Sequence, residues 1–148
     1  MLPFKKFIIC ASIDRHLYCT SSPFIDDFSE AITCYEDALT TYELLLGKEN
    51  VFISIPFEKL GSCFIKERRH KDAMDVLEKA LEIRVKNGHQ EDLTTAEIYF
   101  NMGIIHCETG KLHKSVDCYE EAIKIKIREL GSESIDVAQV SFVSDFPV

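Results

Sequence analysis

The sequence has little that points to catalysis or to metal binding. Its six cysteines include no Cys-x-x-Cys pair, and no His-x3-His accompanies them, so neither a zinc site nor a thioredoxin-like motif is expected. Its six glycines are scattered and form no phosphate-binding loop. His106 and Cys107 are neighbours, but adjacent side chains on a helix point about 100° apart and do not pair. We therefore expect no cofactor, no metal and no enzymatic activity.

Long apolar runs and an excess of positive charge are also lacking. The start, MLPFKKFIICASI, has an apolar run of only about five residues, which is poor for a signal peptide and too short for a membrane span. The net charge of −8 argues against non-specific binding to nucleic acid or to anionic membranes, because both require counter-charge. Six cysteines would permit three disulfides, but Cys34, Cys63 and Cys118 fall on apolar helical stripes. We expect a reducing, cytoplasmic location.

The strongest pattern is a pair of helical stripes between residues 55 and 86. The 148 residues are 46% apolar and 28% charged, as expected of one globular domain. A break at 67–70 separates the two stripes and predicts an antiparallel helix hairpin. Small residues in the stripes let the two backbones approach closely. The stripes consist of Phe57, Leu60, Gly61 and Phe64, then Ala73, Leu77, Ala80, Leu81 and Ile83.

The hairpin belongs to a repeat with a period of 42 residues. Glycine recurs at Gly61 and Gly103, and a Leu-Gly pair at 46–47 recurs two periods later at 130–131. Agreement in so many columns indicates a repeat array rather than coincidence. The other matching columns are Ala31/Ala73/Ser115, Tyr35/Leu77/Tyr119, Ala38/Ala80/Ala122 and Leu39/Leu81/Ile123.

The period divides the chain into three copies with atypical ends. The first copy has the weakest opening helix, but its second helix is well patterned from 28 to 46 and is followed by Gly47. Stability should be nearly additive between neighbouring copies. The predicted divisions are an atypical segment at 1–11, copies at 12–53, 54–95 and 96–137, the start of a seventh helix reaching 140, and an irregular tail at 141–148.

These columns resemble the tetratricopeptide repeat, whose helices carry an aromatic residue, Leu-Gly and spaced alanines. The second copy shows this in Phe57, Leu60, Gly61, Ala73 and Ala80. The usual unit has 34 residues, and the longer unit here is similar to the repeats of kinesin light chains. The resemblance implies an all-α fold: a right-handed superhelical solenoid of antiparallel helix hairpins, whose first helices line a concave face.

The resemblance also implies where a partner would bind. On matched helices of this family, Asn101 would be exposed on the concave face and would hydrogen-bond the backbone of a bound peptide, while Glu58 and Glu108 would be exposed beside it. The lysines would pair with acidic side chains of that peptide. The carboxylate clamp of some such repeats is missing. The predicted peptide-binding residues are Lys59, Ser62, Lys66, Glu97, Phe100, Asn101 and Ile104.

The sequence thus predicts a non-catalytic scaffold for a protein or peptide partner, with no nucleic acid or membrane ligand. Two alternatives remain open. The repeats can be a docking or regulatory part of a larger enzyme or motor, or the chain can be a degenerate product without function. The identity of the partner and the oligomeric state do not follow from the sequence, because this scaffold serves many partners.

Overall fold

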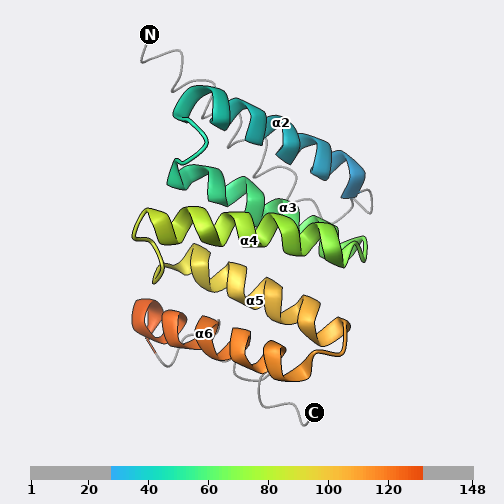
Figure 1. Ribbon diagram of the computed structural model, residues 1–148, viewed down its shortest axis with the longest axis vertical. Helices are drawn as coiled ribbons and strands as arrows, with labels where there is room; N and C mark the ends of the chain where they lie inside the picture. The colour runs from blue at the N-terminus through green and yellow to red at the C-terminus, as the bar shows by residue number, and fades with distance from the viewer. Residues whose placement is uncertain (1–27, 132–148) are drawn as a thin grey trace.

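The computed structural model of the chain describes residues 28–131, and these residues form only helices and their connections (Figure 1). The predictions for 1–27 and 132–148, namely the first opening helix, the seventh helix and the tail, lie outside the described residues. The elements are α2 (Phe28–Leu46), the 3-10 helix η1 (Val51–Ile53), α3 (Ser54–Lys66), α4 (His70–Lys86), α5 (Leu93–Glu108) and α6 (Leu112–Leu130).

The helices are stacked in chain order, and each runs antiparallel to the one before (Figure 1). The stack therefore has two edges. At the connector edge α2, α4 and α6 end while α3 and α5 begin, and at the turn edge short turns join α3 to α4 and α5 to α6. The predicted all-α superhelix of helix hairpins is confirmed, and the predicted helix at 28–46 and break at 67–70 match α2 and the α3–α4 turn.

Local chemistry sets where these elements begin and end. Asp92 caps α5, because its carboxylate accepts a hydrogen bond of 3.1 Å from the backbone of Thr95. Gly47 follows α2 with φ of 84°, a conformation that favours glycine. The α3–α4 turn places Arg68 at φ of 58°, one period before Gly110 at φ of 75°. The same turn geometry thus recurs with and without glycine.

Close packing explains the repeated glycines. A Cβ atom on Gly61 would lie 2.7 Å from the side chain of Leu77, and one on Gly103 would lie 2.6 Å from the ring of Tyr119. Leu77 is fully buried, and Tyr119 is nearly so. Each first helix therefore packs its glycine directly on a large side chain of its own second helix, as the matched columns require.

A buried arginine ties the elements together at the connector edge. Arg84, only 4% exposed, lies in the last turn of α4 and contacts the starts of α3 and α5. Its Nε donates to Thr95 Oγ1 at 2.8 Å, its Nη1 donates to Ser54 Oγ at 2.7 Å, and its Nη2 donates to Asp92. One side chain thus joins the start of α3, the end of α4 and the cap of α5. The repeat pattern does not predict this role for Arg84.

This network should make stability depend on acid pH through Asp92. Burial raises the pKa of Asp92, but the backbone hydrogen bond from Thr95 and the charge of Arg84 outweigh burial, so the pKa is lowered below its usual value. A carboxyl whose pKa is lower in the folded state than in the unfolded state stabilises the fold at pH values above its unfolded-state pKa. This stabilisation is lost as the pH falls through the folded-state pKa. We expect the free energy of unfolding to decrease at pH values under about 4, where an aspartate of the unfolded chain becomes protonated.

The measurement is urea unfolding at several pH values from about 6 to about 3, on the wild type and on Asp92→Asn. Asparagine retains a capping oxygen but does not titrate. The wild type should therefore lose stability more steeply over the acid range. Equal slopes for the two proteins would contradict the assignment of this dependence to Asp92.

Candidate functional site

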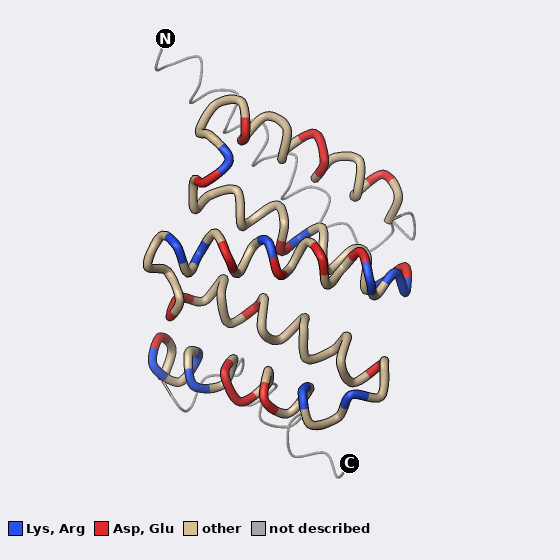
Figure 2. The backbone as a smooth tube through the Cα atoms, viewed as in Figure 1, with Lys and Arg blue, Asp and Glu red and all other residues tan. Residues whose placement is uncertain are grey.

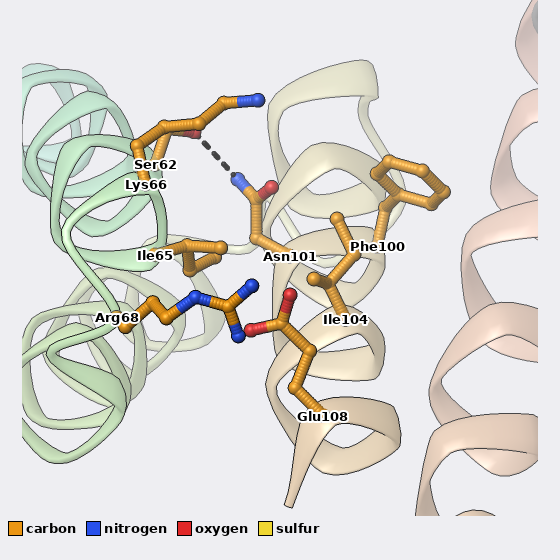
Figure 3. A pocket seen from close by; sticks show the side chains of 8 residues that line it. All are labelled: Ser62, Ile65, Lys66, Arg68, Phe100, Asn101, Ile104 and Glu108. Atoms are coloured by element: carbon orange, nitrogen blue, oxygen red, sulfur yellow. Dashed lines mark hydrogen bonds between the residues drawn. The ribbon is translucent and has the colours of Figure 1, made fainter.

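The α3–α5 groove is a cavity of about 400 Å³ between the first helices of two successive repeats (Figure 3). It extends to the turn edge, because Arg68 and Glu108 both line it. Five sequence-predicted residues line the groove, whereas Lys59 and Glu97 do not. The complete lining is Ser62, Ile65, Lys66, Arg68, Phe100, Asn101, Ile104 and Glu108.

The predicted exposure of Glu58 and Asn101 is wrong. Glu58 is 3% exposed and Asn101 is 7% exposed. Asn101 Nδ2 donates to Glu58 Oε1 at 2.9 Å and to Ser62 Oγ at 3.1 Å, so α5 is bound to α3 through this amide. The physical reason is that a buried carboxylate requires donors, and Asn101 supplies one from the next repeat.

Lys59 completes the same polar network. Its Nζ lies 3.1 Å from Glu58 Oε2, while its own side chain remains 41% exposed. Lys59 is therefore partly neutralised before any partner arrives. The side-chain oxygen of Asn101 points away from Ser62 (Figure 3), whereas the NH₂ group already donates hydrogen bonds to Glu58 and Ser62. What Asn101 can still offer a partner is a hydrogen-bond acceptor.

Phe100 is fixed from two sides. Its ring centroid lies 5.6 Å from that of Tyr119 and 5.8 Å from Lys126 Nζ. Lys126 is 5% exposed and also approaches Glu97 Oε1 to 2.7 Å. Glu97 is therefore engaged in an ion pair beside the groove, and Phe100 forms a preorganised wall. Lys126 stands one period after Arg84, and its role was not predicted from the sequence.

The free charges of the groove lie at its turn-edge end. Among residues 28–131, no ion pair is formed by Lys66 or Arg68, and Lys66 is exposed. Glu108, also in the lining, approaches His70 Nε2 to 3.4 Å. Ile65 and Ile104 supply apolar surface between these charges and Phe100. The groove can thus hold an apolar group and attract a negative one.

A second cavity of about 400 Å³ lies between α4 and the end of α5. Its lining includes His70, Met74 and His106, and the Nδ1 atoms of both histidines are buried without a hydrogen bond. Burial lowers the pKa of His106, and the nearby Lys111 and Lys114 lower it further. His106 is half-buried. No cluster of three metal-ligating side chains occurs within the described part of the chain.

Comparison with known proteins now identifies the repeats. Two family models, each described as tetratricopeptide repeat, match residues 57–91 and 96–127. The chain carries tetratricopeptide repeats. Their spacing of 42 residues supports the likeness to kinesin light chains, and so does the similarity to the solved structure of BtubC (BKLC).

Two individual proteins share the pattern. BtubC (BKLC) from P. vanneervenii, a solved structure, superposes with a TM-score of 0.71 and 28% identity over 78% of this chain and 45% of its own. The Clustered mitochondria protein homolog of Candida albicans (strain SC5314 / ATCC MYA-2876) is 23% identical over 116 residues, which is 78% of this chain. The tetratricopeptide chain thus spans only 8% of that relative's length. In the present chain, no helix among the described residues is long and apolar enough to cross a membrane.

Proposed function

We propose that the α3–α5 groove of this tetratricopeptide chain binds a peptide segment of a partner protein on the concave face. The repeats support a protein-protein interaction scaffold in general. The observation that carries the proposal is the groove itself, which joins apolar Ile65, Phe100 and Ile104 to two cations without ion pairs. Concave sites that combine an apolar surface with a few polar groups are the usual form of a binding site.

The proposed contacts differ from those expected from sequence. Lys66 and Ile104 remain direct contacts, whereas Lys59 and Glu97 lie outside the lining and already hold ion pairs. Asn101 would accept a hydrogen bond from the peptide, because its amide hydrogens bond Glu58 and Ser62. Ser62 would act chiefly by holding Asn101. No group of the groove needs to react, so the proposed function is binding alone.

Charge reversal at Lys66 tests this proposal. Peptides are first selected on the wild-type chain from a random display library, and their affinities are then measured by calorimetry. We expect Lys66→Glu to weaken the selected peptides by about tenfold or more, because a carboxylate replaces a cation that faces the bound segment.

Lys79→Glu is the matched control, since it makes the same change at an exposed position of α4 away from the groove. Its affinities should equal those of the wild type. Equal losses of affinity in the two variants, or no loss of affinity in Lys66→Glu, would show that the groove is not the binding site.

A second candidate function is a docking or regulatory segment of a larger multidomain protein. It is supported by the match to 8% of the Candida albicans relative. Sequencing of the full-length transcript on both sides of these residues tests it. Additional domains in the same reading frame would support the larger protein, and stop codons close to both ends would exclude it.

A further inference from the structure

Glu108 belongs to two neighbouring sites. Its side chain lines the α3–α5 groove, and its Oε2 lies 3.4 Å from Nε2 of His70, the first residue of α4. His70 lies outside the lining of the groove and lines the second cavity instead. The side chains of His70 and Glu108 are 24% and 35% exposed, so solvent screens their interaction only in part. Glu108 thus connects a titratable group outside the groove to the charge inside it.

On the groove side, Glu108 faces a cation. Figure 3 shows the guanidinium of Arg68 and the carboxylate of Glu108 pointing toward each other. Arg68 and Lys66 line this end of the groove and form no ion pair among residues 28–131. While His70 is neutral, the carboxylate of Glu108 offsets one of these two cations. Once His70 is protonated, it balances Glu108 from outside, and both cations are left for a bound segment.

The second ring nitrogen of His70 can take up the proton. Its Nδ1 is buried and makes no hydrogen bond within the described part of the chain. A neutral ring that keeps its hydrogen on Nε2, toward Glu108, has a bare Nδ1 that accepts a second proton. Histidine is also the side chain whose charge changes most readily near neutral pH. Protonation at Nδ1 would turn the contact between His70 and Glu108 into a pair of opposite charges.

The other charged groups near His70 belong to a surface with an excess of positive charge. At the turn edge, residues 66–72 and 108–114 hold six Lys and Arg against three Asp and Glu, and both turns show blue segments in Figure 2. The lining of the second cavity holds two charges of each sign, from Lys71, Lys111, Asp75 and Glu78. In the turn before α4, Arg69 pairs with Glu67 and Asp72. Within residues 28–131, only Glu108 forms an ion pair with His70.

A second histidine in the same cavity is less suited to respond to pH. Burial lowers the pKa of His106, and the nearby Lys111 and Lys114 lower it further. His106 therefore becomes charged at a lower pH than an ordinary histidine does. It also forms no ion pair among the described residues, whereas His70 has the carboxylate of Glu108 beside its Nε2. A response of the groove to pH is therefore assigned to His70.

We propose that His70, by pairing with Glu108, sets the charge preference of the α3–α5 groove, which binds negatively charged segments more tightly when His70 is protonated. His70 is a positioning residue, because it acts on a bound segment only through Glu108. This regulation rests on the proposed function of the groove and adds pH as its control. Protonation neutralises the carboxylate that opposes Lys66 and Arg68, so the affinity for a negative segment rises as pH falls. By linkage, a negative segment favours protonation of His70 in turn.

Calorimetry at about pH 7.5 and at about pH 5.5, on either side of the usual histidine range, tests the proposal. The probes are a peptide selected on the wild-type chain that contains an acidic residue, and the same peptide with that residue replaced by its amide. The carboxylate of the first peptide stays ionised at both values, because its pKa is near 4. The wild type should bind the acidic peptide about threefold more tightly at the lower pH, the usual size of a partly screened charge interaction. Its affinity for the amide peptide should change little.

His70→Gln should lose this increase, because glutamine keeps a polar side chain but does not titrate. His113→Gln is the matched control, since it makes the same change at an exposed histidine of the turn edge that lines neither cavity, and it should keep the increase. Glu108→Gln should bind the acidic peptide more tightly than the wild type at the higher pH, an effect that a merely structural role would not produce. Circular dichroism checks that each variant remains folded, and Glu108→Gln decides the question if His70→Gln unfolds.

Equal affinities of the wild type for the acidic peptide at the two pH values overturn the inference, as does an increase that His70→Gln retains. Selection of peptides without acidic residues overturns it as well. Lys66→Glu, measured with the same peptides, separates this inference from the proposed function. If Lys66→Glu weakens the peptides but pH has no effect, the groove is the binding site and only the role of His70 fails. If Lys66→Glu has no effect, the groove is not the peptide site and both proposals fail.

Discussion

Arg84→Ala should lower the free energy of unfolding by about 3 kcal/mol, near the lower end of the cost of breaking a buried ion pair, because the side chain of Asp92 is 35% exposed. Arg84 is 4% exposed, and its guanidinium contacts Ser54, Asp92 and Thr95. The substitution leaves a carboxylate without its counter-charge and two hydroxyl groups without a donor. The expected loss is large because these partners lie at the start of two other helices, α3 and α5.

The loss should spread beyond one helix. Neighbouring repeats stabilise each other mainly through their interfaces, and Arg84 lies where the second copy meets the connections on both sides. Urea unfolding followed by circular dichroism measures the change. Lys86→Ala is the matched control, because Lys86 lies two residues further on and pairs with Glu49 and Glu82 at the surface. Its stability should stay close to wild type, and a loss as large as that of Arg84→Ala would contradict the buried network.

The repeat architecture was predictable because it depends on local periodicity. The spacing of Ala31, Tyr35 and Ala38 predicts α2, and the charged run at 67–70 predicts the turn before α4. The glycines at 61 and 103 are fixed by close packing against Leu77 and Tyr119, so they repeat with the period. These features require only a helical stripe and its partner within one hairpin.

The contacts between repeats were not predictable in the same way. Glu58 and Asn101 were assigned to the exposed concave face by their columns, but their burial depends on how closely α3 approaches α5. The column of Glu58 holds Phe100 in the next repeat, so the repeat pattern does not specify a carboxylate there. Side chains that form contacts between repeats need not recur at the repeat period.

Arg84 carried a signal that the sequence analysis missed. It stands seven residues after Leu77, on the apolar stripe that also carries Ala80. A charge at a core-facing position of a helix requires a partner, because burial of an unpaired charge is costly. Lys126 occupies the same column one period later and is also buried, with Glu97 as its partner. Charged residues on apolar stripes therefore predict ion pairs between neighbouring helices.

Asn101→Leu should lower the free energy of unfolding by about 1.5–3 kcal/mol, because hydrogen bonds to buried charged groups contribute about that much. Glu58 would lose the donor that lies 2.9 Å away, while Ser62 lies 3.4 Å from the same carboxylate. The cost arises mainly from the acceptor that is left behind. Removal of that acceptor as well should therefore recover stability.

The double variant Glu58→Leu, Asn101→Leu tests this reasoning. Replacement of both members of a buried polar pair by apolar side chains is often neutral, so the double variant should be more stable than Asn101→Leu alone. Urea unfolding of the wild type, both single variants and the double variant gives the coupling energy, expected at about 1–3 kcal/mol. Additive losses would mean that the two side chains do not act together. Recovery would assign Asn101 to holding α5 against α3, with contact to a bound peptide as a secondary task.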